Sequence, residues 1–107
     1  MVSDQVFYIL AALAGGVRHG YGIITDVAEL SGGAVRLGAG TLYTALTRLL
    51  DEETVVITRE EKEGGRLRRY YRLTPKGRQR LQNELARREA LIAQVRQWIP
   101  RAAKQAV

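Results

Sequence analysis

The 107-residue chain contains no cysteine and only one histidine. Without cysteine there is no disulfide framework, no thiolate nucleophile and no zinc site of the cysteine type. A single histidine also excludes clusters of histidine ligands, and we expect neither a metal nor a cofactor. No apolar stretch approaches the roughly 18 residues of a membrane span, and the N-terminal residues do not resemble a secretory signal. We therefore expect a cytoplasmic protein with no membrane partner.

Sequence patterns of common catalytic sites are missing as well. Gly38 and Gly40 lack both the third glycine and the preceding strand of a dinucleotide-binding loop. The only serines, Ser3 and Ser31, do not lie in a nucleophile elbow. The acidic residues 51–53 are adjacent along the chain, so they do not all face one site. These absences predict that the protein is not an enzyme.

Size and charge indicate a small binding domain. A chain of 11.9 kDa has room for one hydrophobic core. The net charge of +6 is unevenly distributed, because residues 1–58 carry −3, residues 59–88 carry +7 and residues 89–107 carry +2. Positive charge concentrated in one short stretch favours a polyanionic partner. A solvated helix face is the alternative explanation for that stretch.

Apolar residues recur with helical spacing in the first half of the chain. A first helix should begin after Ser3, a good N-cap, and end at the glycine pair 15–16. A glycine-rich connection, residues 18–22, should lead to a short second helix that begins at Ile23 and ends at Ser31. A third helix should follow residues 38–40.

The expected third helix has two different faces. Three threonines are poor helix formers, so an exposed face built from them suggests a functional reason. The apolar stripe consists of Leu42, Ala45, Leu46, Leu49 and Leu50, and the opposite face carries Thr41, Thr44, Thr47, Arg48 and Asp51.

A β-hairpin is predicted next. Residues 55–58 and 69–73 have the composition of paired strands. The charged segment 59–68 between them contains the pair Gly64-Gly65, so we expect a long charged tip. Thr74-Pro75 then marks a helix start, with threonine as N-cap and proline in the first helical position.

The last helix should run from Pro75 to about Ile99, over about 37 Å, and Pro100 should end it. A helix of this length cannot be covered by the small domain before it, so a second copy of the chain would cover the excess. Arg88 interrupts the seam and would either fix the register or mark a place where the helices splay. Residues with the alternating spacing of a coiled-coil seam are Leu81, Leu85, Arg88, Ile92, Val95 and Ile99.

The element order predicts a mostly α (α+β) winged helix-turn-helix with a long C-terminal helix. The expected parts are a DNA-binding domain at 1–74, a dimerisation helix at 75–100 and a disordered tail at 101–107. In this architecture the third helix enters the major groove. The wing would offer Lys62, Arg66 and Arg68 to phosphates. A winged helix that binds only protein is the alternative.

Three stretches resemble the PadR family of bacterial transcriptional regulators. They are HGYGI at 19–23, GTLYTALTRL at 40–49 and GRLRRYYRLTPKG at 65–77. Together they span most of residues 5–80 in the order and spacing of that family.

This resemblance implies a DNA-binding homodimer, usually a repressor, on a pseudo-palindromic double-stranded operator. It implies that Tyr43 and other residues of the third helix contact DNA, and that Arg66 and Arg68 meet the phosphate backbone. Some small members bind flat aromatic molecules between the subunits, where a tryptophan of the last helix stacks on them. Trp98 matches that tryptophan, although ordinary dimer packing explains it equally well.

Two positions depart from the family pattern. Thr44 replaces the usual proline after the recognition tyrosine, and Thr54 stands where the family has glycine just past the helix. The third helix should therefore end differently, either a turn later or with a strained residue. These departures support the alternative function, a small-molecule-binding or protein-docking module without sequence-specific DNA binding.

Overall fold

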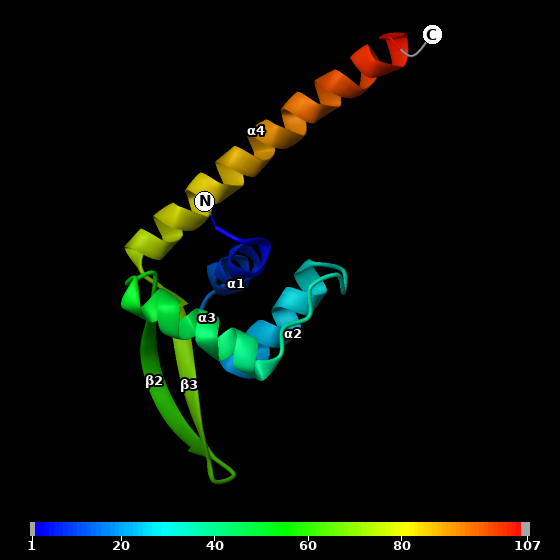
Figure 1. The fold of residues 1–107 in the computed structure, drawn as a ribbon. Coiled ribbons are helices and arrows are strands. Elements are labelled where there is room, and N and C mark those ends of the chain that lie inside the picture. The colour runs from blue at the N-terminus through cyan, green and yellow to red at the C-terminus, as the bar shows by residue number, and fades with distance from the viewer. Residues whose placement is uncertain (1, 106–107) are drawn as a thin grey trace.

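Three short helices and a small antiparallel sheet enclose one core, and a long fourth helix leaves it as an arm (Figure 1). The computed structural model describes residues 2–105. The sheet has the strand order β1-β3-β2. The elements are α1 (Asp4–Ala14), β1 (Arg18–His19), α2 (Gly20–Leu30), α3 (Ala39–Asp51), β2 (Val55–Glu63), β3 (Arg66–Leu73) and α4 (Pro75–Gln105).

Local capping chemistry sets the predicted helix starts. The Ser3 hydroxyl accepts a hydrogen bond from the Val6 N–H at 3.2 Å, as expected for the N-cap of α1. The Thr74 hydroxyl accepts one from the Gly77 N–H at 3.0 Å, and Pro75 occupies the first position of α4. Both starts are confirmed.

The connection predicted at residues 18–22 is structured instead. Arg18 and His19 form β1, which pairs with Tyr71 and Tyr70 of β3, and α2 begins at Gly20, three residues earlier than expected. The His19 side chain is the N-cap, since its Nδ1 accepts a hydrogen bond from the Gly22 N–H at 3.1 Å. The glycines in this segment therefore serve close packing and helix initiation rather than a loop.

The hairpin differs from the expected long tip. Its strands continue through the charged segment, and only Gly64 and Gly65 form the turn. Both glycines have positive φ, +57° and +80°, as in the tight type I′ turn of two-residue hairpins. A bulge at Thr58 shifts the register between Ile57 and Arg59. Cross-strand pairs of opposite charge, such as Glu60 with Arg69, stabilise these charged residues as strand rather than as the long tip predicted from the sequence.

The helix α3 ends with a strained residue, as one of the two alternatives predicted, but at another position. Glu53, with φ +58°, is the only non-glycine residue with positive φ in residues 2–105. Thr54, where we expected the family glycine, is fully buried. The left-handed position that favours glycine is therefore 53.

The core lies between the helices and the inner face of the sheet. The first turn of α4 packs tightly on the start of β2, because a Cβ at Gly77 would lie 2.0 Å from the Thr54 carbonyl oxygen. The buried apolar residues that form one cluster are Ile9, Leu10, Ala12, Leu13, Ile23, Val27, Leu37, Leu42, Leu46, Leu49, Val55, Tyr71, Leu73 and Leu81.

The arm formed by α4 is longer than predicted. The helix passes through Pro100 and ends at Gln105, so residues 101–105 of the expected tail are helical; residues 106–107 lie outside the described part. Pro100 removes one backbone donor, but the alanines and long unbranched side chains after it are good helix formers. The radius of gyration, 17.2 Å, exceeds the roughly 13 Å of a compact chain of this length, because α4 projects from the core (Figure 1). Residues 89–105 of this arm are all exposed.

Among the described residues, no helix combines the length and the apolar character needed to cross a membrane.

Candidate nucleic-acid interface

The predicted DNA-contacting residues of α3 all lie on its solvent side. Because Leu42, Leu46 and Leu49 face the core, the helical repeat of 100° per residue places Thr44 and Thr47 farthest outward. Two stripes flank this centre: Thr41 and Arg48 on one side, and Tyr43 on the other. All five residues of the predicted set, Thr41, Tyr43, Thr44, Thr47 and Arg48, are exposed.

A glycine in α2 positions Tyr43. A Cβ at Gly20 would lie 2.9 Å from the Tyr43 hydroxyl oxygen and 3.3 Å from its Cζ. The ring therefore rests against the first turn of α2, with half of the residue still exposed. Thr47 donates its hydroxyl hydrogen to the Tyr43 carbonyl oxygen at 2.9 Å, so this hydroxyl can offer a ligand only its lone pairs. Sequence reasoning did not single out Gly20, because its partner is 23 positions away.

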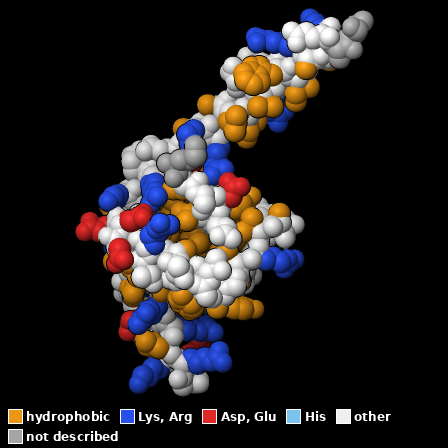
Figure 2. All heavy atoms as spheres, in the orientation of Figure 1, with side chains coloured by type: hydrophobic (Ala, Val, Ile, Leu, Met, Phe, Trp, Pro, Cys, Tyr) orange, Lys and Arg blue, Asp and Glu red, His pale blue; other side chains and the backbone are white. Residues whose placement is uncertain are grey.

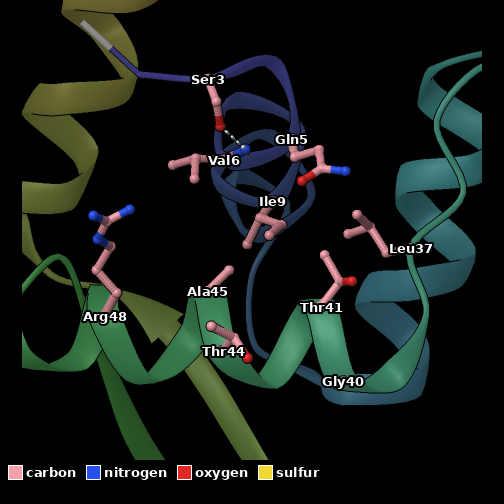
Figure 3. A pocket seen from close by; sticks show the side chains of 10 residues that line it. All are labelled: Ser3, Gln5, Val6, Ile9, Leu37, Gly40, Thr41, Thr44, Ala45 and Arg48. Atoms are coloured by element: carbon pink, nitrogen blue, oxygen red, sulfur yellow. Dashed lines mark hydrogen bonds between the residues drawn. The ribbon is translucent and has the colours of Figure 1, made fainter.

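On its other flank α3 borders a groove of about 740 Å³ that α1 closes from above (Figure 3). Figure 3 shows Arg48 rising from α3 toward the side on which α1 lies. Apolar side chains form part of the lining and polar ones the rest. The lining residues are Ser3, Gln5, Val6, Ile9, Leu37, Gly40, Thr41, Thr44, Ala45 and Arg48.

Arg48 is connected to α4 through Glu52. The Glu52 carboxylate lies 3.8 Å from Arg48 Nε and 2.6 Å from Arg80 Nη1. Arg80 also donates to the Thr54 hydroxyl at 3.3 Å. Arg48 keeps most of its side chain in solvent, whereas Arg80 is about one-third exposed. The C-terminal end of α3 is acidic, since residues 51–53 are Asp-Glu-Glu, so its N-terminal half is the better surface for a polyanion.

Three of the six basic residues of the wing are paired within the hairpin. Ion pairs of 3.0–3.1 Å join Arg59 to Glu61, Arg69 to Glu60 and Arg68 to Glu63. Sequence inspection counted these charges but could not assign partners to them. Of the residues predicted to contact phosphate, Lys62 and Arg66 are exposed and have no ion pair within residues 2–105.

The Tyr70 ring at the base of the wing contacts both β1 and β2. The His19 ring meets the Tyr70 ring edge-on, with centroids 5.5 Å apart, and the Arg59 guanidinium lies 4.0 Å from the centre of the same ring. Because His19 Nδ1 is an acceptor, the neutral ring carries its hydrogen on Nε2. That nitrogen, 3.4 Å from Arg68 Nη1, then cannot accept from Arg68. Arg68 is therefore held by Glu63.

The predicted seam of α4 divides into two parts. Leu81 is buried in the core of its own chain, which disagrees with its predicted place at a dimer interface. Figure 2 shows apolar side chains gathered along the protruding part of the arm. The exposed apolar residues there are Leu85, Leu91, Ile92, Val95, Trp98 and Ile99.

Arg88, the exception in the seam, turns toward α1. Its guanidinium lies 3.9 Å from the centre of the Phe7 ring and 3.2 Å from the Asp4 carboxylate. The nearly buried Glu84 carboxylate accepts hydrogen bonds from Arg87 and from the Val2 N–H. The Arg87 hydrogen bond lowers the pKa of Glu84 in spite of the opposing effect of burial. Arg88 therefore joins α4 to its own domain rather than facing a partner helix.

The comparison with known proteins agrees with this architecture. Residues 9–83 match the family described as "Transcriptional regulator PadR-like family". A curated relative, an uncharacterised 37.1 kDa protein in transposon TN4556 of Streptomyces fradiae, is 43% identical over 82 residues. That match covers 77% of this chain but 22% of the relative, so the chain spans about a fifth of the relative's length.

Solved structures of other proteins have a fold similar to that of this chain. The crystal structure of Bacillus subtilis PadR in complex with operator DNA has a TM-score of 0.68 and 28% identity, covering 77% of this chain and 46% of that chain. A PadR family transcription regulator from Clostridium difficile R20291 has a TM-score of 0.76 and 23% identity, covering 91% and 99%. The predicted mostly α, winged-helix architecture is confirmed.

Proposed function

Because the chain belongs to the PadR-like family of transcriptional regulators, and so to regulators rather than enzymes, we propose that it is a homodimeric repressor of a pseudo-palindromic DNA operator. The observation that carries the proposal is the exposed threonine face of α3 beside the β2–β3 hairpin. Basic side chains gather on this projecting hairpin (Figure 2). The similar Bacillus subtilis PadR was crystallised with operator DNA, which supports the same partner here.

The N-terminal half of α3 reads the major groove in this proposal. Thr44 and Thr47 lie at the centre of the outward face, where a threonine methyl can meet a thymine methyl and the oxygen can accept from a base. Thr41 and Tyr43 flank them. Arg48 contacts the DNA from the side of α3 that faces α1. Its guanidinium can donate two parallel hydrogen bonds to a guanine edge or to a phosphate.

The wing contributes three phosphate contacts in this proposal. Two come from residues without an ion pair within residues 2–105, and the third requires an arginine to exchange its carboxylate partner for a phosphate. Lys62 and Arg66 have no competing ion pair within residues 2–105, whereas Arg68 would have to leave Glu63. Exposed ion pairs are worth about 0–1 kcal/mol, so a phosphate can displace Glu63.

The arm forms the dimer interface in this proposal. Residues 1–74 form the DNA-binding unit, and residues 75–100 carry the dimerisation helix. A second copy would cover the exposed apolar stripe of α4, since contiguous apolar surface of this kind marks an association site. Two recognition helices in a two-fold dimer should then lie about 34 Å apart, one turn of DNA. The residues of the predicted seam that are exposed for this contact are Leu85, Ile92, Val95 and Ile99.

An aromatic small molecule is the effector that the arm would accept. Trp98 is half-exposed and stands among the apolar residues of the stripe. Two copies would bring a pair of indole rings to one interface, and each ring can stack on a flat ligand for about 0.5–1.5 kcal/mol beyond area burial. A ligand there would change the angle between the arms and hence the spacing of the recognition helices.

The test is binding of the purified protein to its own upstream region, compared with a scrambled duplex of equal length at increasing salt. We expect a preference for the upstream region that persists near physiological salt, with a slope of about 0.9 per neutralised phosphate. Arg66→Ala should weaken both duplexes alike, whereas Thr44→Ala and Arg48→Ala should change the sequence preference. Arg101→Ala, an exposed charge at the far end of α4, is the matched control.

The ion pairs that compensate half of the wing's basic residues favour a second candidate, a small-molecule-binding or protein-docking module that does not read DNA. Equal and weak binding of both duplexes, with no preferred sequence selected from a random library, would support it. Quenching of Trp98 fluorescence by aromatic ligands would then become the more informative assay.

A further inference from the structure

Glu52 lies where the recognition helix meets the arm. Its carboxylate is shared between Arg48 of α3 and Arg80 of α4, with N–O distances of 3.8 and 2.6 Å. A small polar cavity of about 270 Å³ opens beside these residues, between α1, α3 and α4. No other ion pair among the described residues joins α3 to α4.

The two halves of this contact differ in strength. The Arg80 contact is short and partly buried, and Arg80 is also anchored on the buried Thr54 hydroxyl at 3.3 Å. The Arg48 contact is long, and the arginine side chain is 77% exposed. Charge-assisted hydrogen bonds of good geometry are stronger than long ion pairs on the surface. Arg80 of α4 therefore holds the Glu52 carboxylate more firmly than Arg48 does.

We propose that Arg80 is a positioning residue: it holds the Glu52 carboxylate and so keeps Arg48 available to DNA. This inference rests on the proposed function. If α4 tilts and Arg80 withdraws, Glu52 loses its stronger partner. Arg48 lies four residues away on the same helix, within reach for a closer pair. Glu52 would then compensate the charge of Arg48, and Arg48 would lose its contact with the DNA.

This contact gives the arm a direct effect on DNA reading, in addition to its effect on half-site spacing. A ligand or partner that changes the angle of α4 would change the affinity of each single recognition helix. The coupling passes through one carboxylate, so it can be removed by a single substitution.

A double-mutant cycle tests the proposal. The probe is the duplex that the wild-type protein selects from a library with about 24 randomised base pairs, enough for two half-sites one turn apart. Arg80→Gln should weaken binding about three- to tenfold, the size expected for one charge contact. Glu52→Gln should bind at least as well as wild type, and the double variant should bind like Glu52→Gln.

Two further measurements separate positioning from a purely structural role. Arg80→Gln should change the sequence preference in the same direction as Arg48→Ala, and the double variant should restore the wild-type preference. Arg80→Lys should retain most of the affinity. Arg78→Gln is the matched control, since it removes an exposed charge two residues away on the same helix that has no ion pair within residues 2–105.

The outcomes are distinguishable. If Arg80→Gln and the double variant bind equally weakly, Arg80 acts on DNA or on folding directly, and the inference is wrong. If wild type selects no preferred duplex, the proposed function itself fails. Urea unfolding and sedimentation of each variant identify any loss of folding or association before binding is compared.

Discussion

Replacing Glu53 by glycine should stabilise the protein. Glu53 has φ +58° at the end of α3, and the left-handed conformation costs an L-residue about 1–2 kcal/mol. Its backbone contacts do not need the side chain: its N–H donates to the Leu50 carbonyl oxygen at 3.0 Å, and its own carbonyl accepts from the Thr74 hydroxyl at 2.6 Å. Glycine can keep both contacts.

The gain is smaller than the strain that is relieved. Glycine makes the unfolded chain more flexible, which costs about 0.4–1 kcal/mol. The difference leaves about 0.5–1 kcal/mol of added stability, or roughly 2–6 °C in Tm for a domain of this size. Urea unfolding followed by circular dichroism at 222 nm, at one protein concentration, resolves a change of this size.

Two variants act as controls. Glu53→Ala removes the same charge beside the C-terminal end of α3 but keeps the left-handed strain, so the comparison of glycine with alanine isolates the backbone effect. Thr54→Gly, at the position where the family pattern had suggested glycine, should be destabilising, because Thr54 is fully buried and its hydroxyl accepts from Arg80. Equal stability of Glu53→Gly and Glu53→Ala would refute the argument.

The Tyr43 side chain, the Glu84 carboxylate and the exposed stripe of α4 can each be tested by one substitution. Gly20→Ala should displace the Tyr43 side chain, whose hydroxyl oxygen would lie 2.9 Å from the new Cβ, and weaken operator binding with the fold retained, whereas Gly22→Ala, with no contact closer than 3.6 Å, should not; equal effects in a binding titration would contradict this. The lowered pKa of Glu84 means that its ionised form contributes stability above its unfolded pKa of about 4.3, and that this contribution is lost as the pH falls through the lower folded value. Urea unfolding between about pH 2 and 7 should therefore show a shallower acid limb in Glu84→Gln than in wild type. Ile92→Glu in the exposed stripe should give a monomer by sedimentation, and Glu89→Gln, an exposed change on the same arm, should not; an unchanged dimer in Ile92→Glu would contradict the seam.

Features that depend on neighbouring residues could be predicted from the sequence. The hydroxyls of Ser3 and Thr74 cap the helices that follow them, and the apolar repeat of α3 identified its buried face. The polar face of α3 followed directly from the same repeat. These features depend on chemistry within one or two turns, which the sequence displays.

Features that depend on distant partners could not be predicted from the sequence. Arg80 and Glu52 are 28 positions apart, and nothing in either neighbourhood indicates that they meet. Arg88 follows the heptad pattern, yet Phe7 and Asp4 draw it to α1. Gly20 lies in a segment that resembles a loop in the sequence, and its packing against Tyr43 is visible only in the structure.

In the proposed dimer, the uncovered part of α4 would link helix formation to protein concentration. From residue 89 onward every described side chain is exposed, and helices in proteins take most of their stability from packing of an apolar face rather than from helix propensity. A lone chain would therefore keep its winged-helix core but fray along this segment, and helix would form there as two chains meet. The amount of protein in the cell would then set the fraction of complete arms, so that dilution alone lowers helicity and DNA binding together. A concentration series of circular dichroism spectra would show this directly, since the helical signal per residue should rise as chains associate.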